Sequence, residues 1–148
     1  MDTSKIITSN AIKIFIGIVL YFFLMKLLGL ENISELRALN FLIVVWGINA
    51  SVKKNIIENN DNTYLTNLFV AFSTSFFAVL AVALSLIFYI TFIDYELIHV
   101  MENSSFWGNN LSLGLVVFAI LIEGLASSVI CSFIIMQYWK KHKVSSIA

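Results

Sequence analysis

The chain has very few of the residues that build catalytic or metal sites. Its 148 residues contain no proline and one cysteine, Cys131. One cysteine forms no intrachain disulfide and one thiol builds no zinc site, so Cys131 is interpreted as an apolar filler. The motifs HExxH, GxSxG and CxxC are also absent. We therefore predict no catalytic residues, no metal site and no cofactor, and we do not expect an enzyme.

Charged residues are also scarce. Charged residues make up 12% of the chain and hydrophobic residues 59%. A soluble domain carries about twice that charged fraction, so most of the apolar surface should face lipid. Nine basic and nine acidic residues cancel, and no basic tract is present. The composition predicts the lipid bilayer as a partner and no binding of nucleic acid.

Four apolar segments follow one another along the chain, at residues 6–30, 36–52, 64–93 and 111–138. A helix needs about 20 residues to cross the hydrocarbon core, and the second segment is short by that measure. We predict an all-α fold: a single integral membrane domain over residues 1–148, built as an antiparallel bundle of four transmembrane helices with short loops. Without proline, none of these helices should carry a proline kink.

The loop between the third and fourth segments contains an amphipathic pattern. Leu97, Ile98 and Met101 fall on one helical face, opposite Glu96 and His99. This pattern is typical of a short helix lying at the membrane interface.

Lysine and arginine are distributed unequally between the two sides of the predicted bundle. One side holds Lys5, Lys13, Lys53, Lys54, Lys140, Lys141 and Lys143, and the other holds Lys26 and Arg37. Cytoplasmic loops carry the excess of positive charge. We therefore predict a multi-pass protein of the cell inner (plasma) membrane with both termini in the cytoplasm.

Glu123 is the most informative residue of the sequence. It is the one charged residue between Ser112 and Tyr138. A carboxylate at mid-membrane costs roughly 2–4 kcal/mol on insertion scales. Without a close cation, desolvation favours the neutral acid, which can donate a hydrogen bond. Counted from the outer ends of the segments, we expect a buried polar or proton site made of Glu123, Tyr21, Ser85, Ser127, Asn40 and Arg37.

Small residues at helical spacing predict the faces that pack together. The predicted packing positions are Gly17, Gly47, Ser51, Ala78, Gly124, Ser128 and Ser132. In the third segment the inward stripe also includes Asn67, Thr74 and Ser85. Trp46 and Asn49 lie on the other face of the second segment, where they form a second contact surface or are tolerated at depth.

The last segment resembles that of a known family. The run Ile122-Glu123-Gly124-Leu125-Ala126-Ser127-Ser128, followed by Ser132 to Lys140, is similar to the last span of small bacterial membrane proteins known as a domain of unknown function. Gly47, Tyr64-Leu65 and Phe92-Ile93-Asp94 continue the similarity upstream. The resemblance implies a four-span bacterial inner-membrane protein and supplies no activity.

Three interpretations of Glu123 remain open at this stage. It is a structural clamp between helices, a proton or cation site of a small transporter, or a contact with another membrane protein. We favour a non-enzymatic structural or accessory protein, with a homodimer or an unidentified membrane protein as partner. The alternative is a small proton- or cation-coupled transporter that uses Glu123.

Overall fold

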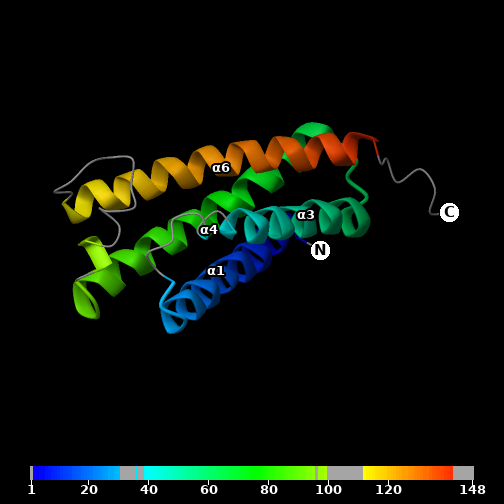
Figure 1. The fold of residues 1–148 in the computed structure, drawn as a ribbon. Helices are drawn as coiled ribbons and strands as arrows, with labels where there is room; N and C mark the ends of the chain where they lie inside the picture. Colours follow the sequence, from blue (N-terminus) through cyan, green and yellow to red (C-terminus); the bar gives the residue numbers. More distant parts are fainter. Residues whose placement is uncertain (1, 31–35, 37–38, 96, 100–111, 142–148) are drawn as a thin grey trace.

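The computed structural model describes residues 2–30, 36, 39–95, 97–99 and 112–141. Within these residues the fold consists of four long helices (Figure 1): α1 (Thr3–Leu27), α3 (Asn40–Asn59), α4 (Tyr64–Phe92) and α6 (Leu113–Lys141). The described part of the chain contains no strand. The prediction of an all-α fold is confirmed.

Local signals explain where several helices begin and end. The Asp2 carboxylate caps α1 by accepting a hydrogen bond of 3.3 Å from the Ser4 N–H. After α1, Gly29 adopts a left-handed conformation with φ of 66°, which glycine accepts without steric cost. Asn60 ends α3 in the same region, with φ of 50°.

Three of the helices, α1, α4 and α6, are long and apolar enough to cross a membrane. This finding supports a multi-pass membrane protein. Side chains facing outward from these helices are largely apolar, as Leu20, Leu84 and Phe88 illustrate. Such a surface suits a hydrocarbon environment, where helices pack through their polar and small faces.

The second predicted span corresponds to α3, which is not among these three helices. It begins at Asn40, four residues after the predicted start, and it continues to Asn59. Its last turns carry Lys53, Lys54 and Glu58. The apolar part, residues 40–52, is therefore only about 20 Å long at 1.5 Å per residue, against roughly 30 Å of hydrocarbon.

The helices are arranged around α4, which packs against α1, α3 and α6. In Figure 1, α6 and α1 lie on opposite sides of the pair formed by α3 and α4. The start of α1 lies beside the end of α3, because the Asn59 amide donates to the Thr3 hydroxyl at 3.3 Å. We call this the inner end of the bundle, and we call the opposite end, where α1 and α4 finish, the outer end.

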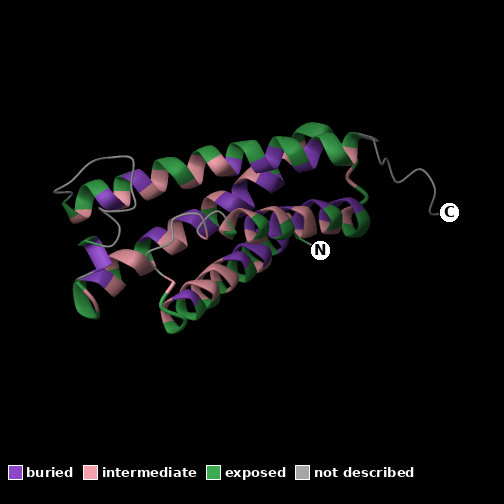
Figure 2. Ribbon diagram, viewed as in Figure 1, coloured by how far each residue is buried: buried purple, intermediate pink, exposed green. Residues whose placement is uncertain are grey.

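Buried side chains line the surfaces where the helices meet (Figure 2). The main cluster takes residues from all four helices, including Ile14, Ile48, Ala71 and Cys131. Burial of Cys131 agrees with the interpretation of this thiol as an apolar filler.

A smaller cluster at the outer end joins Ile90 to Leu97 and Ile98. Residues 97–99 form a helical turn with Leu97 and Ile98 buried and His99 exposed. These three residues have the predicted amphipathic arrangement. Glu96 and Met101 of the predicted interfacial helix lie outside the described residues.

Candidate functional site

A chain of polar side chains connects α3 to α4 in the inner half of the bundle. The hydroxyls of Ser51 and Thr74 share a hydrogen bond of 2.8 Å, and the Asn55 amide donates to the Asn67 side-chain oxygen at 3.0 Å. All four side chains are buried. Polar pairs of this kind hold helices together in a membrane, where unsatisfied polar groups are costly.

The same network ties down the connection between α3 and α4. The Asn67 amide also donates to the carbonyl oxygens of Asp61 and Thr63, at 2.7 and 3.0 Å. Asn59 donates to the Asn55 side-chain oxygen at 2.9 Å. We call Ser51, Thr74, Asn55, Asn67 and Asn59 the inner polar network. The polar groups of this network find hydrogen-bond partners within the chain, so the network has the geometry of a structural connection between α3 and α4.

The sequence analysis included Ser51, Asn67 and Thr74 in the inward stripes but missed Asn55 and Asn59. These two residues fall after Val52, the end of the second predicted segment, in the stretch that connects it to the third. A signal was present, because Gly47, Ser51, Asn55 and Asn59 continue one stripe at a spacing of four residues.

The glycines of the predicted packing faces lie in close helix contacts. A Cβ atom at Gly47 would lie 2.1 Å from Cγ1 of Ile14 on α1, and one at Gly17 would lie 2.9 Å from Cγ2 of Ile43 on α3. A Cβ atom at Gly124 would lie 2.6 Å from Cγ1 of Val79 on α4. The structure also buries the other four predicted packing positions, Ser51, Ala78, Ser128 and Ser132.

Lys26, Tyr89 and Asp94 form a polar cluster at the outer end, which we call the outer clamp. Lys26 forms an ion pair with Asp94 and donates a hydrogen bond of 2.6 Å to the Tyr89 hydroxyl. Its Nζ atom also lies 5.2 Å from the centroid of the Tyr89 ring. The clamp joins the end of α1 to the end of α4. In the sequence Lys26 served to predict orientation, and the structure pairs it with Asp94.

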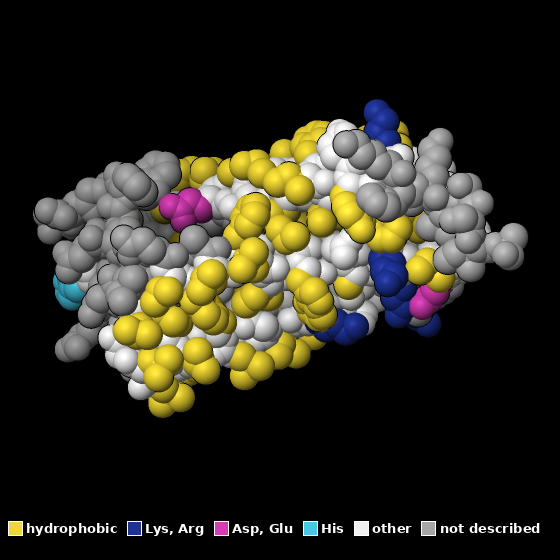
Figure 3. Space-filling view, turned by 45° about the vertical axis from the view of Figure 1, so that its right-hand side comes forward, with side chains coloured by type: hydrophobic (Ala, Val, Ile, Leu, Met, Phe, Trp, Pro, Cys, Tyr) yellow, Lys and Arg dark blue, Asp and Glu magenta, His cyan; other side chains and the backbone are white. Residues whose placement is uncertain are grey.

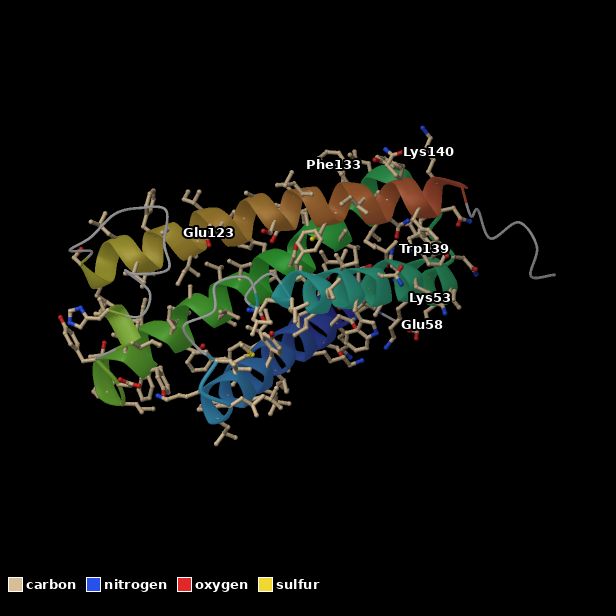
Figure 4. The ribbon with its side chains drawn as sticks, viewed as in Figure 1. Lys53, Glu58, Glu123, Phe133, Trp139 and Lys140 are labelled. Carbon is tan, nitrogen blue, oxygen red and sulfur yellow. The ribbon has the colours of Figure 1, made fainter. Side chains whose placement is uncertain are left out.

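Glu123 is exposed, and the expectation of a buried carboxylate is corrected on this point. Val116 and Ala119, on nearly the same face of α6 one to two turns earlier, are buried. Figure 4 shows Glu123 on the side of α6 that faces the other helices.

The predicted partners of Glu123 are engaged elsewhere. The Tyr21 hydroxyl donates to the Leu36 carbonyl at 2.8 Å, and the Ser85 hydroxyl donates to the Val82 carbonyl at 2.9 Å. Ser127 is half-buried, one turn after Glu123. The side-chain oxygen of Asn40 is buried, and no described residue forms a hydrogen bond with it. Arg37 lies outside the described residues.

Helix register explains why this cluster does not assemble. Gly124 lies against Val79, which is six residues before Ser85 on α4. Gly47 lies against Ile14, which is seven residues before Tyr21 on α1. Ser85 and Tyr21 are therefore about two turns, roughly 10 Å, closer to the outer end than Glu123. Among the described residues, Glu123 makes no hydrogen bond or ion pair.

The outward face of α3 carries a large aromatic side chain. Trp46 is 60% exposed, and Leu42, one turn earlier on the same face, is 61% exposed. Asn49 accepts a hydrogen bond of 2.9 Å from the Trp139 indole of α6. Of the two residues singled out in the sequence, Asn49 thus contacts α6, whereas Trp46 points away from the bundle.

The fold and these sites define the chain as a multi-pass helical membrane protein. A scan against protein-family models and searches of curated proteins and of solved structures found no match. The resemblance to the small four-span bacterial family stays a prediction.

Proposed function

We propose that this chain is a non-enzymatic accessory protein of the bacterial inner membrane that acts by lateral association with membrane protein. In this proposal all four helices form an antiparallel transmembrane bundle, with both termini in the cytoplasm. The observation that carries the proposal is Glu123: an exposed carboxylate, without a partner among the described residues, in the middle of a helix apolar enough to span a membrane.

Energetics favour a covered carboxylate. A carboxyl group that faces hydrocarbon costs several kcal/mol, and such residues in membranes almost always face protein or a water-filled cavity. The part of the chain that the structure describes supplies no such cover, because it leaves the side chain exposed. A protein surface that packs against this part of α6 would remove the cost and would use the carboxylate as a point of recognition.

The shortness of α3 supports the same proposal. Its apolar part is too short to cross hydrocarbon unaided, and Trp46 is exposed on its outward face. Tryptophan is enriched among the residues that dominate protein contacts. A neighbouring membrane protein would shield α3 from lipid along the face that includes Trp46.

Transport is the less favoured alternative. A proton-coupled carrier needs polar groups that lead from its carboxylate to an aqueous side. Here the inner polar network is satisfied internally, and Glu123 makes no hydrogen bond to the described residues. The face of the molecule that Figure 3 shows is largely apolar in its middle, with basic side chains gathered toward one end.

Site-specific photo-cross-linking in native membranes tests the proposal. A photoreactive residue at Ile130, which shares the face of Glu123 two turns later, should yield a discrete protein adduct. The matched control is Phe118, which is exposed on a different face of α6. If neither position forms an adduct, the proposal is contradicted. So would a proton flux in reconstituted vesicles that disappears in Glu123→Gln.

A further inference from the structure

Two opposite charges are exposed inside the candidate membrane spans. Lys13 lies on α1, about 15 Å along the helix from its start, and Glu123 lies on α6. The described residues supply neither side chain with an ion pair. Lys26, near the outer end of α1, is already paired with Asp94. Lys13 and Glu123 are therefore complementary charges that the single chain leaves apart.

Helix contacts place these two charges at similar levels of the bundle. Ile14, next to Lys13, lies against Gly47 of α3. Ser51 follows Gly47 by one turn, toward the inner end, and its hydroxyl shares a hydrogen bond with that of Thr74 on α4. Val79 follows Thr74 by five residues, toward the outer end, and lies against Gly124, the neighbour of Glu123 in the sequence. Followed through these contacts, Lys13 and Glu123 differ by at most about two turns, or roughly 10 Å.

Both charges also lie beside α3. Lys13 is one turn before Gly17, which contacts Ile43 of α3, so it lies on the α3 side of α1. Glu123 lies on the side of α6 that faces the other helices (Figure 4), and the contacts above place it near the level of Trp46 of α3. Between the two charges, α3 presents Leu42 and Trp46, its most exposed apolar side chains apart from the termini. The surface thus has a basic flank, an apolar centre and an acidic flank.

We propose that the occupant of this surface is a second copy of the chain, related by a two-fold axis along the membrane normal that passes close to α3. This inference rests on the proposed lateral association. A two-fold interface is self-complementary, so residue i meets residue j and j meets i. Lys13 of each copy pairs with Glu123 of the other, and the two Trp46 side chains pack near the axis.

Charge balance favours a second copy over an unrelated partner. The pairing satisfies both intramembrane charges with residues that the chain already holds. Long lysine side chains extend along helices to reach a polar group, which accommodates the difference in level. The dimer also covers the face of α3 that contains Trp46, and so it explains how a short helix is held in the membrane.

Charge exchange provides the test, with dimerisation of the full chain measured by native mass spectrometry in detergent and by cross-linking in vesicles. Glu123→Lys and Lys13→Glu should each weaken dimerisation about tenfold or more. The double variant Lys13→Glu/Glu123→Lys should restore it. The matched control, Lys53→Glu, reverses an exposed charge at the inner end and should leave the dimer intact.

A second measurement avoids variants whose charges disturb folding. In a Cys131→Ser background, Leu42→Cys should form an intermolecular disulfide on oxidation, because Leu42 lies close to the proposed axis. Leu84→Cys, on the exposed face of α4 at a similar level, should not.

Each failure has a distinct meaning. A wild-type chain that is monomeric in vesicles overturns the dimer, as does a double variant that is not rescued. If the Ile130 photoadduct contains a different protein and no second copy, the dimer is wrong and the proposed accessory function stands. If no photoadduct forms at all, both proposals fail.

Discussion

Asn55 on α3 and Asn67 on α4 are joined by a hydrogen bond of 3.0 Å between two buried amides. Asn55 also accepts from Asn59, and Asn67 also donates to the two carbonyls of the connecting loop. This pair therefore fixes both the contact of the two helices and the turn between them. Asn55 lies in the part of α3 that follows Val52, where the helix is least apolar.

The first prediction concerns this pair. Asn67→Leu should destabilise the protein by about 1–2 kcal/mol, because it leaves the Asn55 amide and two loop carbonyls without their partner. Unfolding by denaturing detergent, followed by circular dichroism, measures the change. Asn62→Ala, in the same loop but exposed, is the control and should change stability little. Equal effects of the two substitutions would contradict a structural role for the pair.

The second prediction concerns the contact of α1 with α3. Gly47→Ala places a Cβ atom 2.1 Å from the Ile14 side chain, so one helix must shift. We expect a loss of about 1–3 kcal/mol, the usual cost of overpacking, in the same unfolding assay. Gly114→Ala is the matched control, since the nearest atom to its Cβ is the Ser112 hydroxyl at 3.9 Å. A stable Gly47→Ala protein would show that α1 and α3 do not pack as described.

The third prediction concerns the outer clamp. Asp94→Asn should weaken the attachment of α1 to α4 by about 1 kcal/mol or less, because both partners of the ion pair remain partly exposed to solvent. The loss should be smaller at high salt, where the pair is screened. A double-mutant cycle with Lys26→Met measures the coupling energy. If the changes in unfolding free energy of the two single variants add up to that of the double variant, the two residues do not interact directly.

The fourth prediction concerns orientation in the membrane. If both termini lie in the cytoplasm, as proposed, and all four helices span the membrane, the loop between α3 and α4 lies on the cytoplasmic side as well. In a Cys131→Ser background, Asn62→Cys should resist a membrane-impermeant thiol reagent applied to intact cells and react after permeabilisation. Labelling in intact cells would reverse the proposed topology.

Much of the candidate site was predictable because it depends on spacing within one helix. Gly47 and Ser51, or Gly124 and Ser128, share a face whatever the helix packs against. The structure places Gly47, Ser51 and Gly124 in contacts between helices and buries Ser128. Side-chain size alone carries this information, since close approach of two helices in a membrane requires small residues.

Partners across helices were less predictable. The sequence analysis placed Glu123 level with Tyr21 and Ser85 by assuming that all segments end at one plane. The register is instead set by contacts such as Gly124 with Val79 and Gly47 with Ile14, and these place Ser85 and Tyr21 about two turns closer to the outer end. A shift of this kind leaves no trace in the hydrophobic pattern.

The sequence by itself determined the all-α class, the three long apolar helices and the small-residue faces, because hydrophobicity and helical period are local properties of the chain. Only the tertiary structure decided that α3 begins at Asn40 and that Glu123 is left uncovered beside it. It also decided that Lys26 forms an ion pair with Asp94. These outcomes depend on how four helices slide and tilt against one another, and that is fixed by the fit of side chains between helices.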